Sequence, residues 1–325
     1  VKADNSNDSS YPPGKPQESL DFAYFGGIYR DAYLISTGPV YITDPNEAGT
    51  VAGGGIFFRT ESLDPRTRKG KVGVKVQVAN NTDKEQKVRV QALMTDPKGV
   101  DPVGETAPLV IPPHSTGEVD IPLVISNVRP WSPDNPNLYT LSVEVWKAAG
   151  GADAKNPAHL LDNRSMRVGV RTVEITEKGL VLNGSLFPEK LIGGNRHQDF
   201  ARLGNAVPNN LQWQDAVKLR KAGMRVIRSA HYPQDPAFMD ACDRLGLFVI
   251  VATPGWQFWG KGPFADRVYD DVRQMVRRDR NHPSVMMWEP ILNETHYPKD
   301  FAKKVRDLVH EEYPYPGCYT ACDAV

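Results

Sequence analysis

The chain has 325 residues, enough for two or three domains that each bury a core of their own. Its 39 basic and 39 acidic side chains give a formal net charge of zero, so no global positive field attracts nucleic acid or an anionic membrane surface. The mean hydropathy of −0.45 and the lack of an apolar run of about 18 to 20 residues argue against a membrane span. We therefore expect a small or neutral partner, no nucleic acid and no membrane span.

Residues 1 to about 20 are rich in Asn, Asp, Ser, Pro and Gly and have no apolar period, which predicts a loop. The next stretch, GIYRDAYLIS at 27–36, sets apolar residues against Arg30 and Asp31 and is followed by Gly38-Pro39. This pattern is typical of a half-buried strand. We therefore expect one strand before residue 40.

Short strands recur from about Val40 to Thr172. The clearest segments are 72–80 (VGVKVQVAN), 87–95 (KVRVQALMT), 117–125 (GEVDIPLVI) and 139–147 (YTLSVEVWK). Strict alternation in VKVQV and VRVQA places one face on a core and the other in water. Because turn residues separate these segments and no helical period intervenes, they predict an antiparallel β-sandwich of immunoglobulin-like size.

After Arg171 strands alternate with helices. The expected strands are 180–184, 190–195, 224–229, 247–253 and 285–288, and the expected helices are 209–222, 235–245 and 264–279. Near-continuous apolar strands between helices of this length predict βα units around a parallel sheet that is buried on both faces. Such units fit a (β/α)₈ barrel or a doubly wound sheet, although no G-x-G-x-x-G follows the first strand.

Polar side chains follow four consecutive strands of this region. In chain order they are Asn195, Arg196, His197 and Asp199; Arg228, His231 and Tyr232; Trp256, Gln257 and Trp259; and Asn293 and Glu294. In a (β/α)₈ barrel the loops after the strands converge on the active site. Rings, guanidinium groups, amides and a carboxylate at four strand ends in a row therefore predict a catalytic or binding site.

Glu294 is the candidate proton donor. A carboxylate after an apolar strand and an Asn can protonate a glycosidic oxygen, while the amide of Asn293 can bond the neighbouring sugar hydroxyl. The alternatives are a surface glutamate at Glu294 and an acid at Glu289. Trp256 and Trp259 suit the apolar face of a sugar ring, but packing at the rim explains them equally well.

The other polar residues have structural explanations as well. His197 and His231 are each compatible with a satisfied structural histidine. Arg228 is compatible with a simple carboxylate pair, and Arg196 with a solvated loop charge. Asp199 is best explained as a loop or capping residue.

These motifs resemble glycoside hydrolase family 2, the group of β-galactosidases, β-glucuronidases and β-mannosidases. The resemblance runs from about Asp21 onward and rests on GGIYRDAYLI (26–35), NRHQDF (195–200), RSAHYPQDPAFMDACDRLGLFVI (228–250) and RDRNHPSVMMW (278–288) before Asn293-Glu294. It implies the end of a jelly-roll domain over 1–39, an immunoglobulin-like sandwich over 40–172 and the first half of a (β/α)₈ TIM barrel over 173–325.

The resemblance also implies a retaining exo-β-glycosidase, most similar to a β-galactosidase, that acts on a glycoside or oligosaccharide. Glu294 matches the family's general acid/base, and Asn293 matches the residue that contacts the 2-hydroxyl. His197 and His231 match histidines that line the sugar subsite, and Arg228 matches an arginine that supports the pocket.

Asp21 matches a jelly-roll aspartate that reaches into the galactose site of β-galactosidases, and a plain loop aspartate is the alternative. WEPILNE, which ends at Glu294, has one more residue before Asn293 than the usual W-S-L-G-N-E. Many β-galactosidases have I-E-T-H-G, with magnesium ligands, where this chain has WQFWG at 256–260. Neither Gln257 nor Trp259 replaces a Glu or His ligand, so we predict no metal there, and no other cofactor is indicated.

The family's nucleophilic glutamate lies near the seventh barrel strand, whereas this chain stops near the start of the fifth. We therefore expect the nucleophile beyond Val325. The sequence starts at Val1 without a leader, which leads us to expect a processed or excised segment. It does not predict a cellular compartment. A half-barrel has an open sheet edge, which predicts further chain or a homo-oligomer. The functional alternatives are a β-glucuronidase, a β-mannosidase and a non-catalytic carbohydrate-binding fragment.

Three cysteines are too few and too irregularly spaced for a disulfide framework or a zinc site. The spacing of Cys318 and Cys322 also differs from the C-x-x-C of a redox motif. We therefore expect Cys242 and these two residues to be buried or unused thiols.

Overall fold

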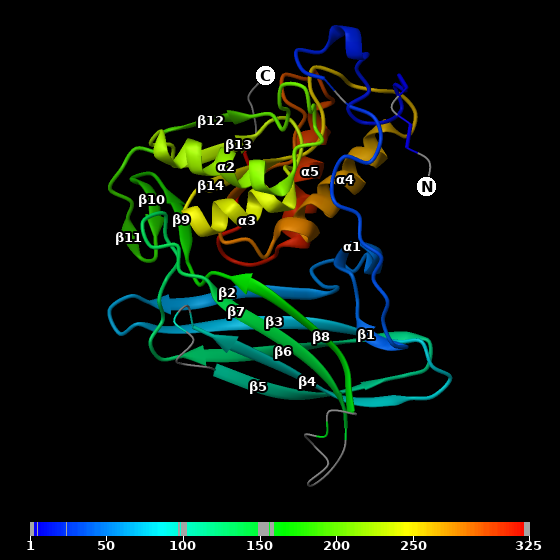
Figure 1. Cartoon of the computed structure of the whole chain (residues 1–325), viewed down its shortest axis with the longest axis vertical. Helices are drawn as coiled ribbons and strands as arrows, with labels where there is room; N and C mark the ends of the chain where they lie inside the picture. Colours follow the sequence, from blue (N-terminus) through cyan, green and yellow to red (C-terminus); the bar gives the residue numbers. More distant parts are fainter. Residues whose placement is uncertain are drawn as a thin grey trace. The chain divides into compact units, whose positions relative to one another are not determined.

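The computed structural model describes residues 3–321 except for 5, 24, 97, 99–102, 149–155, 157 and 158. The chain forms two compact units (Figure 1). We call them the sandwich unit (Ile35–Phe187 with Arg280–Pro283) and the half-barrel unit (Val1–Leu34, Pro188–Asp279 and Ser284–Val325).

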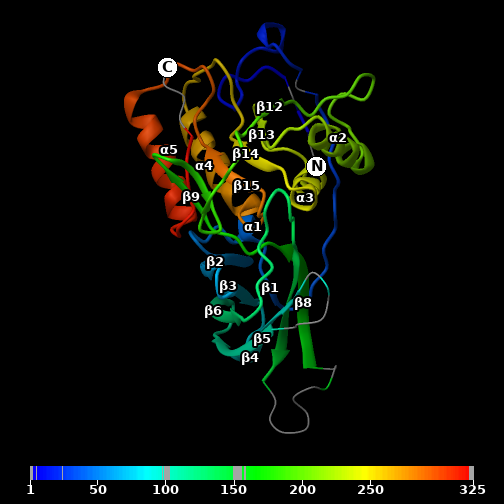
Figure 2. The same ribbon diagram turned by 90° about the vertical axis from the view of Figure 1, so that its left-hand side faces the viewer.

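Two antiparallel sheets build the sandwich unit (Figure 2). In the first, one central strand pairs with all the others: β3 (Lys69–Asn80) pairs with β1 (Val40–Ile42), β2 (Ile56–Asp64) and β6 (Ser115–Ile125). The second runs in the order β5 (Val103–Ile111), β4 (Gln86–Thr95), β7 (Tyr139–Lys147) and β8 (Leu160–Val168). The predicted sandwich strands are confirmed as β3, β4, β6 and β7.

Alternation along the strands builds the sandwich core. In β7 the side chains of Tyr139, Leu141, Val143 and Val145 are buried, and those between them are half-buried or exposed. The sequence did not predict β2, β5 and β8. In β5 the signal is weakened by Pro108, which an edge strand tolerates because its outer N–H groups have no ladder partner.

The predicted strand at 180–184 exists as β10 (Gly179–Leu182), but it does not open a βα unit. It pairs antiparallel with β9 (Val173–Thr176) and β11 (Ser185–Leu186) in a small separate sheet. The sandwich unit also contains a short helix, α1 (Pro45–Ala48), which no helical period predicted because it has only one turn.

The predicted strand at 27–36 is wrong. These residues form no strand, and the side chain of Leu34 is fully exposed while Ile28 and Ile35 are about two-thirds exposed. A strand needs a neighbour to satisfy its backbone hydrogen bonds. No described strand lies beside this segment, so its alternating pattern has nothing to pair with.

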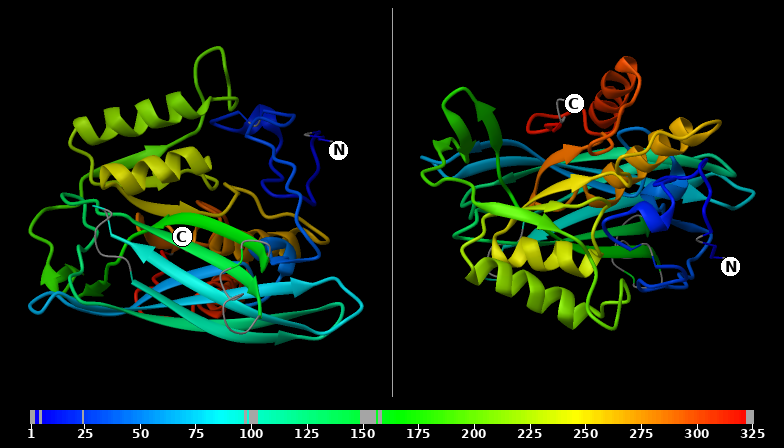
Figure 3. Two further views of the ribbon diagram at one scale, coloured as in Figure 1. Left: turned by 60° about the horizontal axis from the view of Figure 1, so that its bottom comes forward. Right: turned by 90° about the horizontal axis from the view of Figure 1, so that it is seen from above.

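Four parallel strands form the sheet of the half-barrel unit (Figure 3). They follow each other in chain order: β12 (Gly193–Arg196), β13 (Val226–Ser229), β14 (Phe248–Ala252) and β15 (Val285–Glu289). The predicted strands at 190–195, 224–229, 247–253 and 285–288 are confirmed. A doubly wound sheet reverses its strand order partway, so consecutive order over four strands decides for the barrel.

Four helices alternate with these strands. They are α2 (Asn209–Lys221), α3 (Pro236–Leu245), α4 (Phe264–Asp279) and α5 (Lys299–Glu312), and α2 packs beside α3 as α4 packs beside α5. The first three confirm the predicted helices, whereas α5 was not predicted. The limits of α3 follow from its sequence, because the Asp235 side chain caps its first turn and Gly246 adopts a left-handed φ of 70° after its last.

Both described cysteines are free and buried, as expected. Burial raises the pKa of the Cys242 thiol well above its usual range and that of Cys318 to about 12. Cys322 lies outside the described residues. Within the described part of the chain, every helix is too short or too polar to cross a membrane.

An ion-pair network joins α4 to α5. Arg277 donates from Nε and Nη2 to the two carboxylate oxygens of Glu312 at 3.0 and 2.6 Å, and Arg273 donates from Nη1 to Glu312 at 2.8 Å. The side chain of Glu312 is fully buried. Arg273 also pairs with the neighbouring Glu311, which is 47% exposed.

We predict that Glu312→Ala lowers the free energy of unfolding of the half-barrel unit by about 3 to 5 kcal/mol, because it leaves a buried guanidinium without its partner. Glu311→Ala is the matched control, since it removes an exposed carboxylate from the same arginine and should cost under about 1 kcal/mol. Urea denaturation followed by circular dichroism measures both. Equal losses of unfolding free energy in the two variants would contradict the idea that the buried position of Glu312 makes its ion pairs important for stability.

Candidate active site

An ion pair between a half-buried arginine and a buried glutamate lies at the ends of β13 and β15. Arg228 donates from Nε to Oε2 of Glu289 at 2.6 Å and from Nη2 to Oε1 of the same carboxylate. Its Nη2 also donates to Oδ1 of Asn293 at 2.9 Å, and its Nη1 to Oδ1 of Asn195 at 3.4 Å. Glu289 is only 2% exposed. Both of its oxygens are engaged by Arg228, so neither is free to serve as a proton donor to a substrate.

Glu294 has a different environment from Glu289. Its side chain is exposed, and its Oε2 accepts hydrogen bonds from Trp256 Nε1 at 3.1 Å and Gln257 Nε2 at 2.7 Å. Within the described chain Oε1 has no hydrogen-bond partner. One oxygen is therefore held by the protein while the other faces outward.

The backbone brings these donors to Glu294. Trp256 forms an isolated parallel bridge with Asn293, and the Gln257 N–H donates to the Asn293 carbonyl at 3.0 Å. Gln257 and Glu294 have positive φ values of 47° and 50°, a conformation that non-glycine residues seldom adopt. The loops after β14 and β15 are thus joined at the position where the amide meets the carboxylate.

Aromatic rings and imidazoles form a cluster beside this carboxylate. The His231 ring is stacked parallel to Trp256 with 6.5 Å between centroids and meets His197 edge-on at 5.5 Å. Phe22, from the N-terminal segment, lies 4.6 Å from the His197 ring and 5.9 Å from Trp256. Tyr232 closes the cluster, and its hydroxyl accepts a hydrogen bond from the backbone N–H of Gln198.

Burial keeps both imidazoles uncharged near neutral pH. It lowers the pKa of His231 to about 4, with a further contribution from the positive charge of Arg228, and it lowers the pKa of His197 as well. The buried Nδ1 atoms of both rings have no hydrogen-bond partner among the described residues. Neutral rings offer one donor and one acceptor each, which suits the hydroxyl groups of a sugar.

The structure gives Arg196 a different role from the solvated loop charge considered above. It is 6% exposed, and its guanidinium donates to the side chains of Asp215, Gln234 and Gln212 at 2.5 to 2.8 Å. It therefore ties the end of β12 to α2 and to the loop after β13. These partners lie far along the chain, so no local pattern indicated them.

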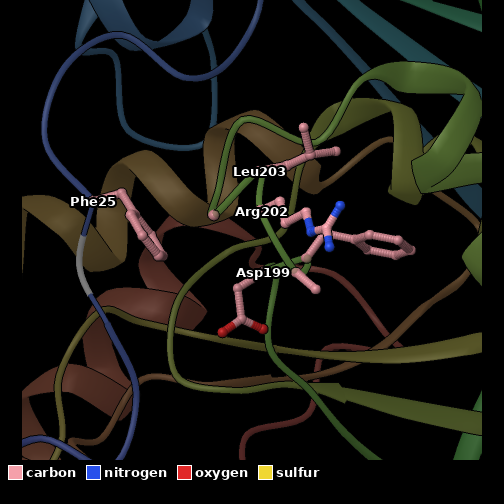
Figure 4. A pocket seen from close by; sticks show the side chains of 7 residues that line it. Phe25, Asp199, Arg202 and Leu203 are labelled. Carbon is pink, nitrogen blue, oxygen red and sulfur yellow. The ribbon is translucent and has the colours of Figure 1, made fainter.

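Three other predicted residues have surroundings of their own. Trp259 packs edge-on against Phe301 at 4.8 Å and so fills space beside α5. Asp21 is exposed and directly precedes Phe22. Asp199 is exposed and lines an open pocket of about 640 Å³ (Figure 4). The other residues around the pocket are Phe25, Phe200, Ala201, Arg202, Leu203 and Gly204.

Two site residues escaped the sequence analysis. Phe22 was overlooked although it follows Asp21, because an isolated aromatic residue in a polar loop carries no signal of its own. Lys15 was overlooked because its contact with Gln257 joins residues 242 positions apart.

Comparison with known proteins identifies relatives of both units. Residues 173–311 match the family model described as "Glycosyl hydrolases family 2, TIM barrel domain", and residues 55–171 match the model "Glycosyl hydrolases family 2". Together the two models cover most of the chain.

Individual relatives agree with the family models. A β-galactosidase from Thermoanaerobacter pseudethanolicus is 29% identical over 96% of this chain and 38% of its own length. A β-glucuronidase from Bacteroides fragilis is 29% identical over 90% of this chain and 41% of its own length. The crystal structure of a glycosyl hydrolase family 2 member from Bacteroides cellulosilyticus matches with a TM-score of 0.79 and 26% identity. The match covers 93% of this chain and 39% of that one. The chain thus spans about two fifths of the length of these relatives.

We predict that His231 makes stability depend on pH. Its pKa is lowered from 6.5 in the unfolded chain to about 4 in the folded one. Between pH 6.5 and pH 4, therefore, His231 is protonated in the unfolded state and neutral in the folded state. Stability is therefore fully present above about pH 6.5 and falls as the pH drops toward 4. In His231→Gln the loss of unfolding free energy over this pH range should be smaller than in the wild type by up to about 2 kcal/mol, after allowance for partial solvation.

Urea titrations at about pH 7 and about pH 4.5 measure this difference for the wild type and His231→Gln. His114→Gln, which removes an exposed histidine of the sandwich unit, is the control. An unchanged pH dependence in His231→Gln would contradict the assignment.

Proposed function

Because the chain belongs to glycoside hydrolase family 2, we propose that it supplies the sugar site and the general acid/base, Glu294, of a retaining exo-β-glycosidase. The observation that carries this proposal is the position of Glu294. It follows Asn293 in the loop after β15, with Oε2 held by two neutral donors. A retaining enzyme needs a carboxyl group in this kind of setting to protonate the leaving oxygen and later to activate water.

Asn293 is suited to bind the sugar hydroxyl next to the reacting carbon. Its Oδ1 accepts from Arg228, which fixes the orientation of the amide. Nδ2 must then face away from the guanidinium, where it can donate to a hydroxyl oxygen. Arg228 thus supports the pocket, as Glu289 in turn holds Arg228.

The ring cluster is suited to the sugar itself. The side chain of Phe22 gives apolar surface for the C–H face of a pyranose, and neutral His197 and His231 offer polar atoms for its hydroxyls. Trp256 is only 5% exposed and supports this cluster from behind, with Lys15 over its ring and His231 stacked on it. We propose a terminal β-galactoside as the substrate, with Asp21 as a further hydroxyl ligand. The β-galactosidase named above supports this choice, and the β-glucuronidase named beside it supports a glucuronide as the alternative.

The attacking carboxylate is not assigned to a residue of this chain. Glu289 is closed to this role because Arg228 occupies both of its oxygens. Trp259 stays a proposed rim residue whose packing against Phe301 leaves part of its ring accessible. We also propose the domain boundaries at 39/40 and 172/173, with the first 39 residues ending a jelly-roll domain.

We predict that Glu294→Gln in the full-length protein lowers kcat/KM by about 10² to 10⁴ for lactose, whose leaving group needs a proton. The same change should affect 2,4-dinitrophenyl β-galactoside far less, because that leaving group departs as an anion. Glu311→Gln, an exposed glutamate on α5, is the control. Full activity of Glu294→Gln on lactose would overturn the assignment.

We predict that the full-length protein prefers galactosides. In a panel of 4-nitrophenyl β-galactoside, β-glucuronide and β-mannoside, the leaving group is constant and only the sugar varies. We expect kcat/KM to be at least about tenfold higher for the galactoside, which corresponds to about 1.4 kcal/mol of transition-state binding. Binding of galactose without hydrolysis of any member would instead favour a non-catalytic carbohydrate-binding protein.

A further inference from the structure

The N-terminal segment 8–22, which we call the strap, lies against the loop that follows β14. Close contact is possible because both sides use glycines. A Cβ on Gly260 would overlap the carbonyl of Ser9, and a Cβ on Gly14 would overlap the ring of Phe258. Gly14 also has a left-handed φ of 71°. The strap therefore approaches this loop more closely than side-chain-bearing residues would allow.

Arg267 on α4 fixes the start of the strap. Its Nη1 donates to the carbonyl and the hydroxyl of Ser10 at 2.6 and 2.7 Å. Its guanidinium also lies 3.3 Å from the ring centroid of Tyr11. Farther along, Phe22 packs on the ring cluster of the candidate site. The strap is thus held on both sides of Lys15.

Lys15 lies between these two anchors and connects to the carboxylate through one residue. Its ammonium is 3.9 Å from the centroid of the Trp256 ring and donates to Oε1 of Gln257 at 2.9 Å. Nε2 of the same Gln257 amide donates to Oε2 of Glu294 at 2.7 Å. A cation, an amide and a carboxylate therefore form a continuous hydrogen-bonded chain.

Lys15 and Glu294 hold the Gln257 amide from its two ends. The two ends of an amide are nearly equal in shape but opposite in hydrogen bonding, since the oxygen only accepts and the nitrogen only donates. An ammonium has donors and no acceptor, so it must meet Oε1. The nitrogen is then directed at Glu294. Without Lys15 the exposed Gln257 side chain is held at one end only, so it gains rotamer freedom and restrains Glu294 less.

We propose that Lys15 is a positioning residue of the glycosidase reaction, acting through Gln257 to hold Glu294 in the orientation that protonates the leaving group. This inference rests on the proposed function of Glu294. It gives the strap a role in positioning Glu294 in addition to its packing against the loop after β14. Lys15 contacts Trp256 and Gln257, the two residues that donate to Oε2 of Glu294, so its effect should fall on proton transfer.

The position of Glu294 matters most when the leaving group needs a proton. In Lys15→Met we expect kcat/KM of the full-length enzyme for lactose to fall by about 10- to 100-fold, a part of the full general-acid contribution. For 2,4-dinitrophenyl β-galactoside we expect a change of less than about threefold, because departure of this anion needs no proton donor. Lys15→Arg keeps a donor for Oε1 and should recover most of the loss.

Lys261→Met is the matched control, because it removes the same charge from an exposed position in the loop after β14. It should leave both substrates unaffected. Equal losses on lactose and the dinitrophenyl substrate in Lys15→Met, or no recovery in Lys15→Arg, would overturn the proposal and leave the strap a purely structural element.

A second measurement does not depend on activity. In a crystal structure of Lys15→Met we expect the Gln257 amide to leave Glu294 Oε2, whereas an unchanged Gln257–Glu294 hydrogen bond would overturn the proposal. If the wild type hydrolyses no glycoside, the proposed function fails, yet this structure still decides whether Lys15 orients Gln257. The two failures are therefore distinguishable.

Discussion

The pair of Arg228 and Glu289 holds the candidate site together. It spans from β13 to β15 across β14, and its bidentate geometry fixes both side chains. Removing these charges from water is costly, and the amide oxygens of Asn293 and Asn195 offset part of that cost by accepting two further guanidinium protons. Because Asn293 is one of these partners, the position of the following residue, Glu294, depends on this ion pair.

A second constraint is backbone geometry. Gln257 and Glu294 both adopt left-handed conformations, which cost on the order of 1 kcal/mol or more for residues with a Cβ. The bridge between Trp256 and Asn293 holds the two loops in register and so maintains these conformations. As a result, the side-chain amide of Gln257 meets Oε2 of Glu294, although strand or helix geometry would direct these two side chains elsewhere. The strap then adds Lys15 from outside the sheet.

Local patterns predicted the parts of the fold whose stabilising contacts are local. The helix α4 and the strand β7 were predicted to the residue because an apolar period is contained in each segment. The strand at 27–36 was wrong because pairing requires a neighbour that no local pattern reveals. Arg196 was misjudged for the same reason, since its partners Asp215 and Gln234 lie on other elements. The sequence located the polar strand ends, but the hydrogen bonds among them required coordinates.

The two glutamates after β15 show why those hydrogen bonds decide function. By sequence Glu289 and Glu294 are both carboxylates near the end of an apolar strand. In the structure a guanidinium saturates Glu289, whereas neutral donors hold one oxygen of Glu294 and leave the other outward. Pairs of carboxylates divide their roles in this way when their surroundings differ. The ion pair therefore fixes the buried glutamate, whereas the exposed one keeps an oxygen without a protein partner, as the proposed proton donor requires.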